Sequence, residues 1–103
     1  MVMIGKVYDE VQCQGFVFTI WVNEERNKNE FTIHSQSVGK TIYKNEEVWD
    51  SDVFKLGRLL KQYQYSRIGI KDMIKKINRT CRHLEVNDVI LLDVYTYEAY
   101  VKL

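Results

Sequence analysis

The sequence contains no proline, only five glycines and only two cysteines among its 103 residues. Without proline, chain reversals fall to glycine, asparagine and aspartate. The two cysteines, Cys13 and Cys81, allow one disulfide at most, whereas a small secreted domain usually needs more cross-links than that. We therefore expect two reduced thiols and a cytoplasmic protein.

Long apolar runs are also missing from the sequence. No stretch approaches the ~20 consecutive apolar residues that a membrane span needs, and no basic region precedes an apolar stretch near the start, as in a secretory signal. These absences argue against an integral membrane protein and against a secreted one. The length, the hydrophobic fraction of 46% and the charged fraction of 28% fit a single globular domain spanning residues 1–103.

The first half of the chain has the alternation and composition of β-strands. The clearest segment is 16–23, which combines β-branched and aromatic residues and stops at a polar cluster. Both faces of this segment are mostly apolar, which predicts a central strand of the sheet. Further strands are expected at 3–12, 30–35 and 38–43.

Helical spacing begins near residue 50. Val53, Leu56 and Leu60 recur at that spacing, and Asp50 and Asp52 are candidate N-caps for this first helix. Gly57 inside it costs up to ~1 kcal/mol relative to alanine, unless it marks a close packing contact. The second helix has a continuous apolar stripe made of Ile70, Met73, Ile74, Ile77, Cys81 and Leu84.

Two further apolar segments follow the predicted helices. Residues 89–94 are typical of a buried strand, and residues 95–101 alternate as one long bent strand or a hairpin would. Strands, then two helices, then strands form a segregated order, which predicts an α+β fold. We expect an antiparallel sheet of about four to six strands with two consecutive helices packed on one face, in the order β-β-β(β)-α-α-β(β).

Motifs for catalysis, metal binding and cofactor binding are weak. Val38-Gly39-Lys40-Thr41 has the end of a phosphate-binding loop, but the first glycine of that motif is replaced by His34. Cys81 and His83 are the only close pair of possible metal ligands, and two-residue spacing on a helix points them apart. We expect a core thiol, a surface histidine, no catalytic residue, no metal and no cofactor.

The acidic pairs of the sequence are interpreted as solvated residues and not as catalytic groups. Glu24-Glu25 and Glu46-Glu47 fall in segments that we expect to be loops. Solvated turns explain such pairs better than a general acid–base arrangement does. The chain is therefore predicted not to be an enzyme.

Charge is strongly segregated, although the net charge is only +1. Residues 51–83 contain nine lysines and arginines against two aspartates, a balance of +7, while residues 1–50 and 84–103 each have a balance of −3. A basic segment of this kind is able to bind a phosphate backbone with release of counterions. The alternative is a solvated helical face whose cations pair with strand carboxylates.

The candidate nucleic-acid interface follows from these cations and from the tyrosines at the junction of the helices. Bases are able to stack on Tyr63 and Tyr65, and the cations are too spread to indicate base-specific recognition. The predicted binding residues are Lys55, Arg58, Lys71, Lys75, Arg79 and Arg82, together with Tyr63 and Tyr65.

A protein-binding function is the alternative. The small size, the lack of a catalytic arrangement and an aromatic content of 13% also fit a regulator or inhibitor of the kind that phages and mobile elements encode against a host or defence protein. A homodimer formed through the final strand, at a sheet edge, is a further possibility. The sequence thus favours a small non-enzymatic binding module with nucleic acid as its first expected partner.

Overall fold

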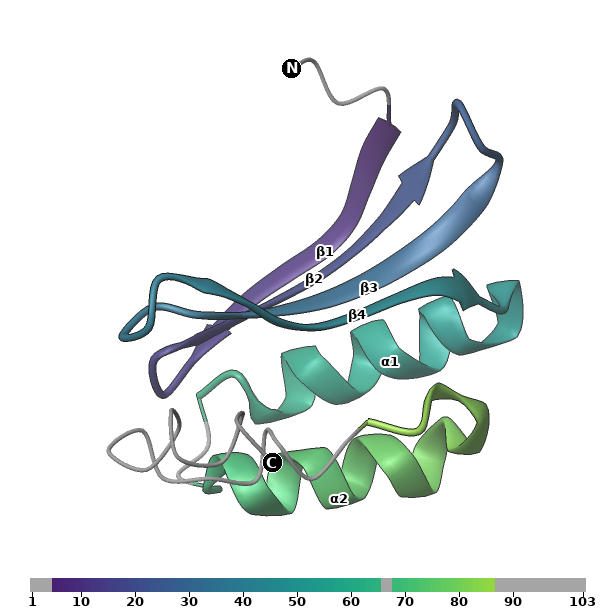
Figure 1. Ribbon diagram of the computed structural model, residues 1–103. Helices are drawn as coiled ribbons and strands as arrows, with labels where there is room; N and C mark the ends of the chain where they lie inside the picture. The colour runs from purple at the N-terminus through teal and green to yellow at the C-terminus, as the bar shows by residue number, and fades with distance from the viewer. Residues whose placement is uncertain (1–4, 66–67, 87–103) are drawn as a thin grey trace.

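A computed structural model describes the chain over residues 5–65 and 68–86 (Figure 1). The first half is an antiparallel sheet and the second half a helical hairpin, which confirms the predicted α+β class. The predicted strands at 89–94 and 95–101 lie outside the described residues. The elements are β1 (Gly5–Cys13), β2 (Phe16–Asn23), β3 (Lys28–Ser35), β4 (Lys40–Val48), α1 (Asp50–Tyr63), α2 (Ile70–Thr80) and the 3-10 turn η1 (Arg82–Leu84).

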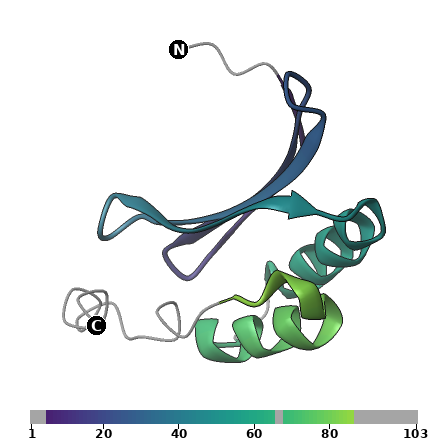
Figure 2. The ribbon, with the colours of Figure 1, turned by 45° about the vertical axis from the view of Figure 1, so that its right-hand side comes forward.

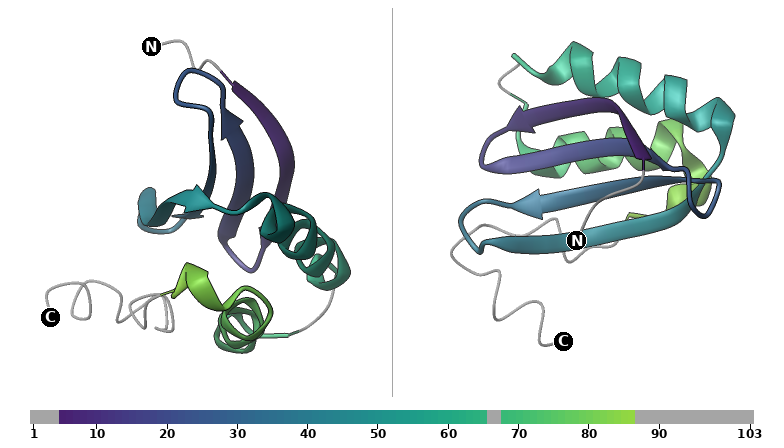
Figure 3. Two further views of the ribbon diagram at one scale, coloured as in Figure 1. Left: turned by 90° about the vertical axis from the view of Figure 1, so that its right-hand side faces the viewer. Right: turned by 90° about the horizontal axis from the view of Figure 1, so that it is seen from above.

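The sheet is a simple meander in which each strand pairs with the next, in the order β1-β2-β3-β4. Figure 3 shows this order from above. Gln14 and Gly15 connect β1 to β2 with φ values of 52° and 84°, the two left-handed conformations typical of a tight hairpin turn. Among the described strands β2 is internal, as its two apolar faces predict.

Strand β4 is longer than the sequence predicted. The expected strand ended at Tyr43, whereas the observed one continues to Val48 and includes Glu46 and Glu47. The prediction that these two glutamates lie in a solvated loop is therefore wrong. Both carboxylates form ion pairs, Glu46 with Arg26 and Glu47 with Lys28, and these pairs suit the exposed surface of a strand.

The core lies between one face of the sheet and the two helices (Figures 1 and 2). Alternating residues of β2 and β3 supply its upper layer, where the rings of Phe18 and Phe31 stack with centroids 6.4 Å apart. The apolar stripes of α1 and α2 supply its lower layer. The side chains with no exposed surface are Phe18, Ile20, Phe31, Ile33, Leu56, Leu60, Met73, Ile74 and Ile77.

Gly57 marks a close contact between α1 and β1. A Cβ atom at this position would lie 2.5 Å from Oδ2 of Asp9, so only glycine fits without a shift of the aspartate. The same carboxylate pairs through Oδ1 with Lys61, one turn further along α1, at 3.2 Å. The packing interpretation of this glycine is confirmed.

The start of α1 differs from the prediction. Trp49, not an aspartate, occupies the N-cap position, and no side-chain hydrogen bond caps the helix. Asp50 and Asp52 lie in the first turn, where their charge still suits the positive end of the helix dipole. Each carboxylate has another partner, because Asp50 accepts a 2.6 Å hydrogen bond from Asn29 and Asp52 is buried beside His83.

The apolar stripe of α2 continues beyond the end of the helix. The helix ends at Thr80, and Cys81 has φ −124° and ψ 73°, which no helix accommodates. Leu84 nevertheless stays buried in the 3-10 turn, and its carbonyl accepts a 2.5 Å hydrogen bond from the hydroxyl of Tyr43 in β4. The predicted stripe thus packs in the core, with Ile70 partly buried, but its last residues are not helical.

None of the helices in the described part of the chain is long and apolar enough to span a bilayer.

Candidate nucleic-acid interface

Six exposed cations on the helical hairpin form the candidate interface, and we call them the helical cations. On α2, three of them lie four residues apart, so they form one row opposite the buried Met73 and Ile77. The fourth residue of this row, Arg82, was predicted to be helical but lies in η1. The helical cations are Lys55, Arg58, Lys71, Lys75, Arg79 and Arg82.

The two helices contact each other and run in opposite directions (Figure 1). The first turns of α1 therefore lie beside the end of α2 and η1. Two contacts fix this end of the molecule: Asp52 of α1 pairs with His83 of η1, and the rings of Trp49 and His83 stack with centroids 4.0 Å apart. Lys55 of α1 is close enough to Cys81, at the end of α2, to influence its thiol electrostatically.

Three acids of the sheet, Glu30, Glu46 and Glu47, find their countercharges within the sheet and its turns. Lys44 approaches Glu46 to 2.9 Å and Glu30 to 4.0 Å. The hydrogen bond between Lys44 and Glu46, together with their attraction, raises the pKa of the lysine and lowers the pKa of the glutamate. Arg26 and Lys28 also pair with glutamates of β4. The partners of these carboxylates are therefore cations of the sheet and its turns, and not cations of the helices.

Within the described part of the chain, the helical cations have no carboxylate partner. Across residues 5–65 and 68–86, no aspartate or glutamate forms an ion pair with any of the six. One ion pair does join sheet and helix, between Asp9 and Lys61. Asp52, one of the two acids of the basic segment, is only 3% exposed and is taken up by His83. Within residues 5–65 and 68–86, the charge segregation seen in the sequence therefore persists in the fold.

His83 is not the surface histidine that the sequence predicted. Its Nε2 meets Oδ2 of Asp52, and these two buried atoms have no other partner among the described residues. A buried carboxylate is costly unless a charged or hydrogen-bonding group compensates it. His83 thus ties η1, with the neighbouring Arg82, to the start of α1.

The aromatic part of the predicted interface is distributed differently from the expectation. Tyr65 is 90% exposed just after α1, and the side chain of Tyr63 lies outside the description. Two other exposed rings lie outside the predicted nucleic-acid interface, Phe54 at 74% and Trp49 at 63%. The sequence offered Trp49 only as a residue of a protein interface, and Phe54 was missed. Phe54 carried a usable signal, because it falls outside the apolar stripe made by Val53, Leu56 and Leu60.

The cysteines offer no activated nucleophile. Burial, with a further contribution from the Asp52 carboxylate, raises the pKa of Cys81 to about 11, and burial also raises the pKa of Cys13. Neither forms a disulfide. Thiols of this kind stay protonated near neutral pH, whereas reactive cysteines have a lowered pKa and some exposure.

Within the described ranges, the structure supports neither a metal-binding site nor a phosphate-binding loop. No group of three or more histidine, cysteine, aspartate or glutamate side chains converges there. Gly39, with φ 76°, ends a turn, and Lys40 begins β4 rather than a helix. The resemblance of residues 38–41 to a phosphate-binding loop therefore does not extend to its structure.

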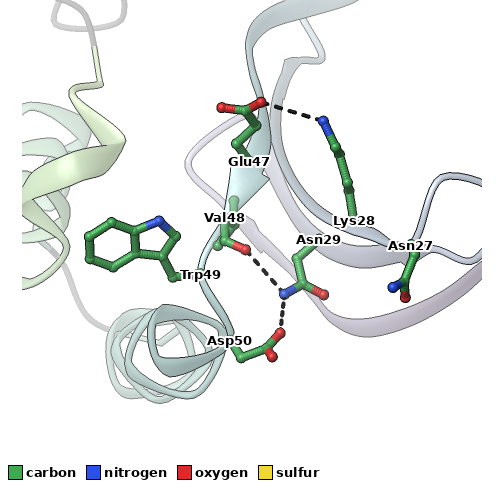
Figure 4. A pocket seen from close by; sticks show the side chains of 7 residues that line it. All are labelled: Asn27, Lys28, Asn29, Glu47, Val48, Trp49 and Asp50. Carbon is green, nitrogen blue, oxygen red and sulfur yellow. Dashed lines mark hydrogen bonds and ion pairs between the residues drawn. The ribbon is translucent and has the colours of Figure 1, made fainter.

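A hollow of about 480 Å³ lies where β3, β4 and α1 meet (Figure 4). Its polar side chains bind one another: Asn29 donates to the carbonyl of Val48 and to Asp50, and Lys28 pairs with Glu47. Figure 4 shows the indole of Trp49 pointing away from these groups. Trp49 also lines the hollow. The hollow thus presents few free polar groups to a ligand.

No family model, curated protein or solved structure matches this chain, so its function is argued from the geometry of its own residues.

Proposed function

We propose that this protein is a non-enzymatic module that binds nucleic acid through the helical cations. The observation that carries the proposal is the absence of any carboxylate partner for these six side chains among the described residues. Exposed cations without carboxylate partners attract phosphates, and binding releases the counterions of the nucleic acid. Cytoplasmic location is part of the same proposal.

The regular row on α2 supports contact with a phosphate backbone. Lys71, Lys75 and Arg79 follow one another at about 6 Å along the helix axis, given a rise of 1.5 Å per residue. Their spacing places three positive charges on one exposed line, opposite the core. Contacts of this type fix the position of a nucleic acid without reading its sequence.

A protein-binding regulator or inhibitor, of the kind that phages and mobile elements encode, is the second candidate. The exposure of Phe54 and Trp49 favours it, since tryptophan and arginine are enriched at the energetic centres of protein interfaces. Such a partner would need an acidic surface to match the helical cations. It would leave the protein without affinity for free oligonucleotides.

Fluorescence anisotropy tests the proposal against this alternative. With labelled single- and double-stranded oligonucleotides, we expect micromolar or tighter binding at about 50 mM salt. If all six cations contact phosphates of a duplex, the logarithm of the association constant falls with the logarithm of salt concentration with a slope of about −5. Absence of binding at low salt, or binding that is insensitive to salt, would contradict nucleic-acid recognition.

A further inference from the structure

We propose that the nucleic acid is single-stranded and that one of its bases stacks on the open face of Trp49. This inference rests on the proposed function and adds the class of ligand and the residue that selects it. It concerns the end of the helical hairpin where α1 begins and η1 ends.

Trp49 is already half of a stack. Its indole lies against the imidazole of His83, with ring centroids 4.0 Å apart and planes inclined by 14°. The tryptophan nevertheless remains 63% exposed, so the ring presents an open surface to solvent. The contact between Oδ2 of Asp52 and Nε2 of His83 holds the imidazole in place. A base added on the open side would continue an ordered stack without any rearrangement of the protein.

Three of the helical cations belong to the same end of the helical hairpin as this stack. Arg82 precedes His83 in η1, Arg79 lies in the last turn of α2, and Lys55 reaches the neighbourhood of Cys81. A nucleotide whose base stacks on Trp49 would therefore have its phosphate near cations from both helices. Stacking rings combined with a basic track are the usual means of holding a single strand.

Phe54 provides a second apolar ring on the same helix. It is 74% exposed and one turn before Arg58, so an aromatic ring and a cation are neighbours on the surface of α1. A phenyl ring makes no hydrogen bond to phosphate, and its exposure serves no purpose in a purely electrostatic contact. A second base or the sugar of an adjacent nucleotide would cover it.

The exposed rings favour a single strand over a duplex. In a duplex the faces of the bases are stacked on one another, and only their edges are accessible in the grooves. A single strand presents the base faces themselves, and stacking of one base on an aromatic side chain strengthens binding by about 5- to 150-fold. Trp49 and Phe54 are able to gain this affinity only from unpaired bases.

The experiment compares an oligothymidine with a duplex of the same length, using wild-type protein, Trp49→Leu and Trp49→Phe. Leucine still covers His83 but has no ring for stacking, whereas phenylalanine keeps a ring. We expect Trp49→Leu to lose tenfold or more of its affinity for the single strand and to keep its affinity for the duplex within twofold. Trp49→Phe should recover most of the lost affinity.

A fluorescence measurement provides a second readout that does not depend on the leucine variant folding well. The chain has two tryptophans, so Trp21→Phe leaves Trp49 as the single indole reporter. Oligothymidine should quench its emission at the same concentrations at which it binds, and the duplex should not.

The outcomes separate this inference from the proposed function. Wild-type binding to both oligonucleotides, with no effect of Trp49→Leu and no quenching, would overturn the stacking site and leave the proposed function standing. An equal loss for single strand and duplex would also overturn it, because the residue would then only support the fold. Failure of the wild type to bind either oligonucleotide would overturn both proposals and favour an acidic protein partner.

Discussion

The quadruple variant Lys71→Gln/Lys75→Gln/Arg79→Gln/Arg82→Gln is expected to lose nearly all affinity for nucleic acid. Each cation that contacts a duplex phosphate contributes about −0.9 to the salt slope, so the slope should become shallower by about 3.6. If the variant and the wild type bind equally at 1 M salt, this difference in slope lowers the association constant of the variant by roughly 10³–10⁴-fold at 0.1 M salt. Glutamine keeps a helix propensity close to that of lysine and arginine, and anisotropy titrations at several salt concentrations measure both quantities.

A matched control distinguishes the effect of the helical cations from the effect of the net charge of the protein. Lys6, Arg26, Lys28 and Lys40 are exposed cations of the sheet and its turns. Replacing these four with glutamine changes the net charge by the same amount as the first variant. We expect this control to weaken binding only slightly. If both variants lose affinity equally, binding depends on net charge and the helical cations are not the interface.

Replacing His83 with leucine should lower the free energy of unfolding more than any other single substitution of a partly exposed residue. The change leaves the carboxylate of Asp52, which is 3% exposed, without its partner. Removal of one member of a buried ion pair usually costs about 3–5 kcal/mol. Since the imidazole is partly exposed, we expect a loss of about 3 kcal/mol in the free energy of unfolding, measured by urea denaturation.

The double variant Asp52→Leu/His83→Leu is the control for this prediction. It removes the carboxylate together with its partner and fills the site with apolar groups, which is often neutral for stability. We therefore expect it to be clearly more stable than His83→Leu alone. A loss below about 0.5 kcal/mol for the single variant would show that water or another group already compensates the carboxylate.

Local patterns account for most of the fold that the sequence predicted. The composition of β2 and the apolar stripes of the two helices express short-range rules, and each has the expected counterpart in the structure. The end of β4 was missed because Glu46 and Glu47 are stabilised by cations on the neighbouring strand and turn. No local pattern carries that information.

The candidate site was predictable in its charges but not in its aromatic part. Exposed cations follow from the helical wheel, because the apolar stripe fixes which side of each helix faces the core. The stack of Trp49 on His83 joins residues 34 positions apart and depends on how α2 returns along α1. The burial of Asp52 depends on the same return, which is why this residue was expected to be a simple cap.

The central claim is that the helical hairpin, and not the sheet, holds the nucleic acid. Amide chemical shifts of the isotope-labelled protein, recorded while oligothymidine is added at low salt, test it most directly because they require no substitution. We predict shift changes concentrated in α1, α2 and η1, with the largest around Lys55, Arg79 and Arg82. Changes concentrated on β1–β4, or a spectrum that does not respond, would contradict the claim.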